Sequence, residues 1–254
     1  MNSKNRTEWE KIEEWYDAQV GLSGHYYHRQ VIFPKLLPLL SFETFDSPAL
    51  LDLGCGQGVL ARLLPPSIPY WGIDLAPSLV AKAKKTASLN HLFYKGDICK
   101  SLPIDKKDFT HATVVLALQN VVSPEKVLLN AAHHLEQGGL LALVLNHPCF
   151  RIPRQTSWGV DTQKKLQYRR IDAYLTPHKI PIQMHPSKKS LATTWSFHHS
   201  LSDFSRFLTQ AGFVILLIEE WKSDKTSTGS AAKMENRARE EFPLFLTFLA
   251  QKIS

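Results

Sequence analysis

Residues 50–60 read Leu-Leu-Asp-Leu-Gly-Cys-Gly-Gln-Gly-Val-Leu, and this stretch decides how the rest of the chain is interpreted. A short apolar run contains one acid, Asp52, and is followed by closely spaced glycines at Gly54, Gly56 and Gly58. The apolar residues that come next, Leu60, Leu63 and Leu64, predict an amphipathic helix. A strand, a glycine-dense turn and a helix in this order typically open an α/β domain that binds a nucleotide-like ligand.

The spacing of the glycines narrows the choice of ligand. A dinucleotide fingerprint, Gly-x-Gly-x-x-Gly, would place its third glycine at residue 59, where this chain has Val59. The Gly-Lys-Ser/Thr ending of a phosphate-binding P-loop is missing as well. The observed pattern is Asp-x-Gly-x-Gly-x-Gly over residues 52–58, so a dehydrogenase is the weakest interpretation. Glycine suits this turn because the backbone can take angles that a Cβ forbids and can approach a ligand closely.

Composition sets the broad class of the protein. The chain has 254 residues, of which 44% are hydrophobic and 21% charged, with a formal net charge of +7. This favours one folded domain, with or without an insertion, and partners that carry negative charge. The three cysteines are scattered without disulfide or metal-binding spacing, and the N-terminus has no signal-peptide pattern, so we expect a cytoplasmic protein without a bound metal. No apolar run approaches the roughly 18–20 residues of a membrane span.

Strands and helices alternate downstream of the glycine turn. We expect strands over 70–74, 92–98, 109–119 and 140–145, with helices beginning at Pro77 and spanning 125–135. A helix over 201–211 with Ser202 as its N-cap, a strand over 213–221, a helix over 233–241 and an antiparallel last strand over 243–250 complete the pattern. The predicted fold is therefore α/β, with a doubly wound, mostly parallel sheet of seven strands and an antiparallel last strand.

Two segments stand outside this alternation. Residues 1–44 are expected to form an N-terminal helical lid, with helices over 7–20 and 25–40, in front of one domain over 45–254. The histidine-tyrosine cluster at residues 25–28 is read either as a packed aromatic hinge or as a cover over the ligand.

Residues 146–200 follow the fifth strand and carry many lysines and arginines against only two acids, Asp161 and Asp172. We interpret this insertion as a substrate cap containing a small β-hairpin, because ligands of open α/β sheets bind where the strands end. The alternative is that these residues form a basic surface segment that binds no ligand.

The motifs together resemble one family. They read Leu-Asp-Leu-Gly-Cys-Gly-Gln-Gly at 51–58, Gly-Ile-Asp-Leu at 72–75, Gly-Asp-Ile at 96–98, Ala-Leu-Gln-Asn-Val at 117–121 and Leu-Glu-Gln-Gly-Gly at 135–139. In this order they are similar to the type 11, ubiquinone/menaquinone-like group of the class I S-adenosylmethionine-dependent methyltransferases, with a Rossmann-like fold. The resemblance is close over residues 45–145 and looser beyond.

The resemblance implies S-adenosyl-L-methionine as the cofactor and assigns roles to individual residues. Asp52, Gly54 and Gly56 would line its methionine part, and Asp74, followed by Leu75, would hold the ribose. Asp97 and Ile98 would flank the adenine, while Leu118 and Gln119 would lie near the sulfonium.

The acceptor of the methyl group is the less defined part of the prediction. We expect a small anionic or phenolic acceptor, bound with the help of Tyr27, Arg151, Arg169 and Arg170. A histidine titrates near neutrality, so His147 is the first candidate for removing an acceptor proton and His28 the next. Two alternatives stay open. One is an RNA methyltransferase that uses the basic insertion, and the other is a non-catalytic cofactor-binding protein that acts through a partner.

Overall fold

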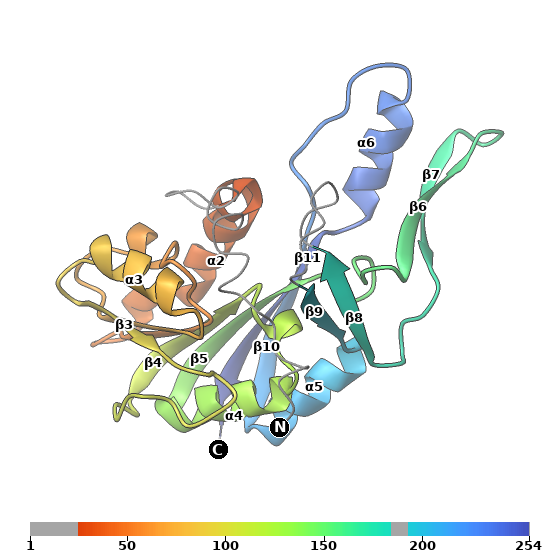
Figure 1. The fold of residues 1–254 in the computed structure, drawn as a ribbon. Coiled ribbons are helices and arrows are strands. Elements are labelled where there is room, and N and C mark those ends of the chain that lie inside the picture. Colours follow the sequence, from red (N-terminus) through yellow and green to blue (C-terminus); the bar gives the residue numbers. More distant parts are fainter. Residues whose placement is uncertain (1–24, 184–192, 254) are drawn as a thin grey trace.

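A seven-stranded sheet forms the centre of the molecule (Figure 1). The computed structural model describes residues 25–183 and 193–253, so the helix expected over residues 7–20 lies outside the described part. The strands of this sheet are β1 (Leu50–Leu53), β2 (Tyr70–Asp74), β3 (His91–Lys95), β4 (Phe109–Val115), β5 (Leu135–Asn146), β10 (Phe213–Trp221) and β11 (Phe245–Lys252). Their order in the sheet is β10-β11-β5-β4-β1-β2-β3.

The strand directions confirm the predicted sheet. Strands β1 to β5 pair in parallel, whereas β11 is antiparallel to both of its neighbours, β5 and β10. The chain winds outward in one direction from β1 through β2 to β3, and in the other from β4 through β5. Ligands of such sheets bind at the carboxyl ends of the strands on either side of this reversal, which here lies between β1 and β4.

Helices cover both faces of the sheet. On one face, α2 (Phe33–Leu40) and α3 (Pro77–Lys85) enclose a buried apolar cluster, and a short π-helix, η3 (His28–Ile32), leads directly into α2. On the other face, α4 (Pro124–His134) and α5 (Leu201–Gln210) enclose a second cluster (Figure 1). The helical segment expected over 25–40 is therefore present, and it packs on the sheet with Val31, Ile32 and Leu36 buried.

The stretch after the glycine turn differs from its prediction. Instead of an amphipathic α-helix, the chain forms a single 3₁₀ turn, η5 (Ala61–Leu63), and Leu63 is 47% exposed. Leu64 is already extended because it precedes Pro65, and a residue before proline is pushed out of the helical region. Leu60 and Leu64 still reach the core, so the apolar pattern indicates which side chains are buried but not the helical period.

The insertion contains two hairpins where one was expected. They pair β6 (Thr156–Asp161) with β7 (Leu166–Ile171), and β8 (His178–Gln183) with β9 (Thr193–His198). The first extends away from the sheet beside α6 (Ala232–Glu241), and the second lies closer to the sheet (Figure 1). Among the described residues, no helix is both long and apolar enough to cross a membrane.

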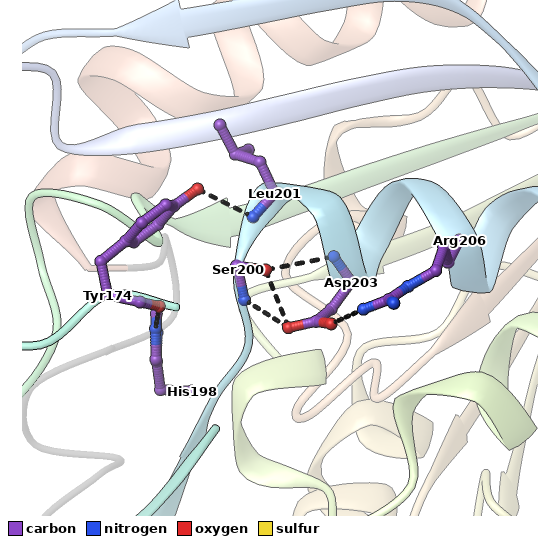
Figure 2. A network of polar contacts seen from close by, with 6 residues as sticks. All are labelled: Tyr174, His198, Ser200, Leu201, Asp203 and Arg206. Atoms are coloured by element: carbon purple, nitrogen blue, oxygen red, sulfur yellow. Dashed lines mark hydrogen bonds and ion pairs between the residues drawn. The ribbon is translucent and has the colours of Figure 1, made fainter. Parts of the chain in front are cut away.

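The N-cap of α5 is Ser200, not the predicted Ser202. Ser200 Oγ accepts a hydrogen bond from the backbone N–H of Asp203 at 3.2 Å, while the Asp203 carboxylate accepts from the N–H of Ser200 at 2.9 Å (Figure 2). This reciprocal capping box needs an acid three residues after the cap, a spacing that Ser200 satisfies and Ser202 does not. Tyr174 reinforces the junction because its hydroxyl accepts from the N–H of Leu201 at 2.9 Å.

Candidate functional site

Asp52 is buried beneath the glycine turn. Its Oδ2 accepts a hydrogen bond of 2.6 Å from the hydroxyl of Tyr70, and its Oδ1 accepts one of 2.8 Å from Thr113. Burial raises the pKa of this carboxyl to about 6, although the two hydrogen bonds act in the opposite direction. Asp52 therefore ties β1 to β2 and β4 beneath the turn, and each of its carboxylate oxygens already accepts a hydrogen bond. The sequence did not reveal its two hydroxyl partners.

The glycine turn approaches the neighbouring loops without side chains between them. Gly54 and Gly56 have positive φ angles of 82° and 55°, which L-residues with a side chain adopt at a cost. A Cβ on Gly54 would lie 2.5 Å from the Cβ of Ala117 and 3.9 Å from the side chain of Ile98. The turn after β1 thus meets the loops that follow β3 and β4, so three of the predicted cofactor segments come together.

Asp74 ends β2 and faces the same turn. Its Oδ2 accepts from the N–H of Gly56 and its Oδ1 from the N–H of Ala76, both at 2.9 Å. Burial raises the pKa of Asp74, while these backbone N–H groups lower it. A carboxylate offers roughly four lone-pair positions, so acceptor capacity remains for a ligand such as a sugar diol. The next residue, Leu75, is partly exposed at this edge.

The loops after β3 and β4 add two further open acceptors. Asp97 Oδ1 accepts from the N–H of Cys99 at 3.1 Å, which leaves Oδ2 without a partner among the described residues. Gln119 donates through Nε2 to the carbonyl of Leu116 at 2.9 Å, and its buried Oε1 has no partner in the described part of the chain. The side chains of Ile98 and Leu118 are buried beside them.

Leu116 marks this loop as strained. It has a φ of 52°, an uncommon angle for a residue with a side chain, and its N–H donates to the carbonyl of Val144 at 2.9 Å. Such strain persists only where the surroundings hold it and is concentrated at functional sites. The site therefore offers a turn without side chains, an acid with spare acceptor capacity and an unpaired amide oxygen. This set fits a ligand with a sugar and an amino-acid group.

His147 follows β5 and has both ring nitrogens engaged. Its Nδ1 accepts from the N–H groups of Cys149 and Phe150 at 3.1 and 3.3 Å, so the proton lies on Nε2, which donates to Glu220 at 2.7 Å. Burial lowers the pKa of His147, and Glu220 opposes this shift. His147 holds the turn over residues 147–150, and taking an acceptor proton would require it to give up one of these bonds. The sequence did not identify Glu220 as its partner.

The segment over 25–28 packs against the start of β11. The ring of Tyr27 lies 5.7 Å from that of Phe245, and its hydroxyl is 3.2 Å from Ser223 Oγ. His28 stacks on Phe33 at 5.3 Å, and burial lowers its pKa to about 4, so it is uncharged at neutral pH. Its buried Nδ1 has no partner among the described residues. The aromatic packing agrees with the interpretation of this cluster as a packed hinge, and a role as a cover over the ligand stays a prediction.

A small cavity of about 30 Å³ lies between the sheet and the insertion. Its lining includes Gln119, His147, Arg151, His198 and His199. His198 is bonded to the carbonyl of Tyr174 at 2.6 Å, whereas the ring of His199 makes no hydrogen bond with the described residues. Burial lowers the pKa of His199, which leaves a neutral imidazole with a free nitrogen. His199 was not among the residues predicted from the sequence, although a His-His pair directly before a helix cap was a signal.

The three candidate arginines are not equivalent. Arg169 donates through Nε to the carbonyl of Phe150 at 2.7 Å, and Arg151 donates to the carbonyl of Leu244 at 3.3 Å, so both lie near one another at the base of the insertion. Arg170 instead pairs with Asp172 at 2.6 Å, and 68% of its side chain is exposed. Successive residues of a strand point to opposite faces, which directs Arg170 away from Arg169.

Comparisons with known proteins agree on the central region. Residues 51–143 match the family model described as a methyltransferase domain. The chain is also 33% identical over 105 residues to the thiol S-methyltransferase TMT1B of Rattus norvegicus, a match that covers 39% of this chain and 42% of that protein. The chain thus matches less than half the length of this relative.

Solved structures share the fold over nearly the whole chain. An S-adenosylmethionine-dependent methyltransferase from Mesorhizobium loti is 22% identical, with a TM-score of 0.67 over 91% of this chain and 100% of that one. Another from Clostridium acetobutylicum is 16% identical, with a TM-score of 0.60 over 97% of this chain and 99% of that one. At these identities the likeness concerns the fold.

Proposed function

We propose that the chain is a class I S-adenosylmethionine-dependent methyltransferase of the type 11 group and that it methylates a small anionic or phenolic acceptor held beneath the insertion. The main support is that the turn after β1 contacts the ends of two other strands. Gly56 donates a hydrogen bond to Asp74 at the end of β2. A Cβ on Gly54 would lie 2.5 Å from the Cβ of Ala117 in the loop after β4. Those loops leave acceptor positions on Asp74 and Gln119 for the cofactor.

In this proposal the predicted cofactor residues interact with different parts of S-adenosylmethionine. Gly54 and Gly56 give the amino-acid end room against the backbone, and Asp52 keeps their turn in place. Asp74 accepts from the ribose hydroxyls, and Asp97 from the adenine amino group. Gln119 Oε1 accepts from the ammonium group or orients the acceptor. Bound S-adenosylmethionine supplies a methyl group activated by the adjacent sulfonium.

The chain's own contribution is to position the acceptor and take its proton. In this proposal the reacting group of the acceptor enters the small cavity beside Gln119, between the cofactor loops and the insertion, and well-aligned reactants gain on the order of 7–11 kcal/mol. We assign the proton to the free nitrogen of His199, which is neutral at pH 7 because burial lowers its pKa. His147 acts here as a positioning residue for the turn over 147–150.

The pH dependence of turnover tests this assignment. With any acceptor that loses a proton, the rate of the wild-type protein should rise with pH along an acid limb whose midpoint lies below about 6.5, the ordinary pKa of histidine. His199→Asn should lower kcat by about 10²–10⁴-fold and remove this acid limb. His147→Asn should lower stability and keep the limb. A limb that follows His147 instead would overturn the assignment.

Substrate trials separate the remaining possibilities. The panel should contain aromatic acids, phenols, a thiol and RNA, with the thiol included because the rat relative is named a thiol S-methyltransferase. Turnover of a small acid or phenol supports the proposal. RNA binding that weakens steeply with salt, together with RNA methylation, would replace it. Tight cofactor binding without turnover of any acceptor would favour the non-catalytic alternative.

A further inference from the structure

We propose that a second cavity, at the base of hairpin β6–β7, binds an aromatic carboxylate as the recognised part of the acceptor, an inference that rests on the proposed function. The cavity has a volume of about 130 Å³. Its walls come from the turn after β5, the hairpin and the segment between α6 and β11: Phe150, Arg151, Trp158, Arg169, Phe242, Pro243 and Leu244.

The charges in this cavity are unbalanced. No carboxylate among the described residues lies within ion-pair distance of Arg151 or Arg169, whereas the neighbouring Arg170 is paired with Asp172. Burial lowers the pKa of Arg151, and the positive charge of Arg169 lowers it further. Partly buried cations are usually paired, and two guanidinium groups with donors to spare present a fork for a planar anion.

Hydrogen bonds and neighbouring rings hold the guanidinium groups of Arg151 and Arg169 in place. Arg169 donates to the Phe150 carbonyl at 2.7 Å and to Thr156 Oγ1 at 2.7 Å, and it lies 5.0 Å from the centre of the Trp158 ring. Arg151 donates to Leu244 and lies 5.1 Å from the ring of Phe245. Each keeps further N–H donors beyond these contacts, so the site is organised before a ligand arrives.

The remaining walls are aromatic. The ring of Phe242 meets those of Phe150 and Trp158 edge-on, with centroids 5.4 Å apart in both pairs. A dry cavity of about 150 Å³ is large enough for benzene, so the present volume suits one aromatic ring or a large part of it. Flat apolar walls beside two guanidinium groups favour a ring that carries a carboxylate over an inorganic anion or a neutral ring.

The position of the cavity indicates which way a bound ligand would extend. Arg151 lines both this cavity and the smaller one that contains Gln119 and His199. A carboxylate held between Arg151 and Arg169 can therefore belong to a molecule whose other end reaches toward the cofactor loops. The methyl-accepting group would be a hydroxyl, amine or thiol at that end.

Crystals soaked with 4-bromobenzoate test the location directly. The anomalous signal of bromine should appear in the cavity, with the carboxylate between Arg151 and Arg169. A signal only at other positions, or none at millimolar concentrations, would overturn the proposal. A ring-sized ligand of this kind is expected to bind with a dissociation constant of roughly 1 mM.

Solution binding separates charge from shape. Benzoate should quench tryptophan fluorescence in a saturable way, which measures its affinity. Arg169→Met should weaken benzoate binding at least tenfold. Lys164→Met, which removes an exposed charge at the tip of the same hairpin, should leave benzoate binding unchanged. Cyclohexanecarboxylate, benzyl alcohol and inorganic phosphate should bind more weakly than benzoate. Equal binding of any of these, or unchanged benzoate affinity in Arg169→Met, would contradict the proposal.

Failure of this inference can be told apart from failure of the proposed function. S-adenosylhomocysteine titrated into the same proteins should bind with equal affinity in the wild type and in Arg169→Met. Normal binding of S-adenosylhomocysteine without benzoate binding would contradict only the proposed carboxylate site. Benzoate binding without binding of S-adenosylhomocysteine would contradict the methyltransferase proposal and support the carboxylate site.

Discussion

Oδ2 of Asp74 accepts a hydrogen bond of 2.9 Å from the backbone N–H of Gly56, and this contact joins the acid at the end of β2 to the glycine turn after β1. The acid is placed by its own strand and by the N–H of Ala76, so its remaining lone pairs have a defined direction. The proposed cofactor site is therefore ordered before a cofactor binds.

Replacement of Asp74 should weaken cofactor binding. Asp74→Ala removes the proposed acceptor for the ribose, and hydrogen bonds to a charged group contribute about 1.5–3 kcal/mol each, so S-adenosylhomocysteine should bind at least tenfold more weakly in calorimetry. Asp74→Asn should lose less. Asp108→Ala, at a side chain that is 74% exposed, serves as the control. Equal affinity in Asp74→Ala and the control would contradict the assigned role.

Gly54 should tolerate no side chain. Gly54→Ala combines a positive φ with a Cβ 2.5 Å from Ala117, so it should lower the free energy of unfolding by about 2–5 kcal/mol and abolish binding of S-adenosylhomocysteine. Gly229→Ala is a matched control because Gly229 has a φ of 92° and a Cβ added there would meet no atom within 4 Å. It should lose about 1–2 kcal/mol and bind normally.

The double variant Gly54→Ala/Ala117→Gly separates the two costs. It removes the close contact and keeps the unfavourable φ, so part of the lost stability should return in thermal melts. Equal stability of the single and double variants would show that the contact with Ala117 is not what limits the turn.

Asp52 should make stability depend on pH. Its pKa in the folded chain is about 6, above the ordinary value of 3.8, so the folded state binds this proton more tightly than the unfolded state. The contribution is fully present below pH 3.8 and is lost as the pH rises through 6. This amounts to about 3 kcal/mol for a shift of roughly two units.

Urea unfolding of the wild type and of Asp52→Asn measures this contribution, since the other groups titrate equally in both proteins. The free energy of unfolding of Asp52→Asn relative to wild type should rise by up to about 3 kcal/mol between about pH 4 and pH 7. A constant difference over this range would mean that the carboxyl titrates normally.

The capping of α5 gives a direct comparison of two nearby serines. Ser200→Ala removes the cap and should cost about 1 kcal/mol of stability, whereas Ser202→Ala, at an exposed position inside the helix start, should cost less than about 0.5 kcal/mol. Chemical denaturation of both variants decides between them. A larger loss at Ser202 would restore the position that the sequence first indicated.

The sheet could be predicted from the sequence because its strands are buried on both faces and separated by turn residues. The runs at 50–53, 70–73 and 140–145 are apolar at most positions, and the acids Asp74 and Asp97 lie where strands end. The local conformation after the turn could not be predicted in the same way, since Pro65 shortens a helix that the leucine spacing favours.

The insertion was predictable as a basic, aromatic cap, but the sequence did not indicate which of its arginines lie near one another. Which arginine faces inward depends on strand register, and the pairing of Trp158 with Arg169 directs Arg170 outward. Partners from distant parts of the chain, such as Glu220 for His147 and Phe242 for Trp158, follow from tertiary packing that a single sequence does not encode locally.

A crystal structure with S-adenosylhomocysteine tests the central claim most directly. We predict density for the amino-acid end along Gly54 and Gly56, for the ribose hydroxyls on the Asp74 carboxylate and for the adenine beside Asp97 and Ile98. Density elsewhere in the molecule, or an empty turn in crystals grown at saturating ligand, would contradict it.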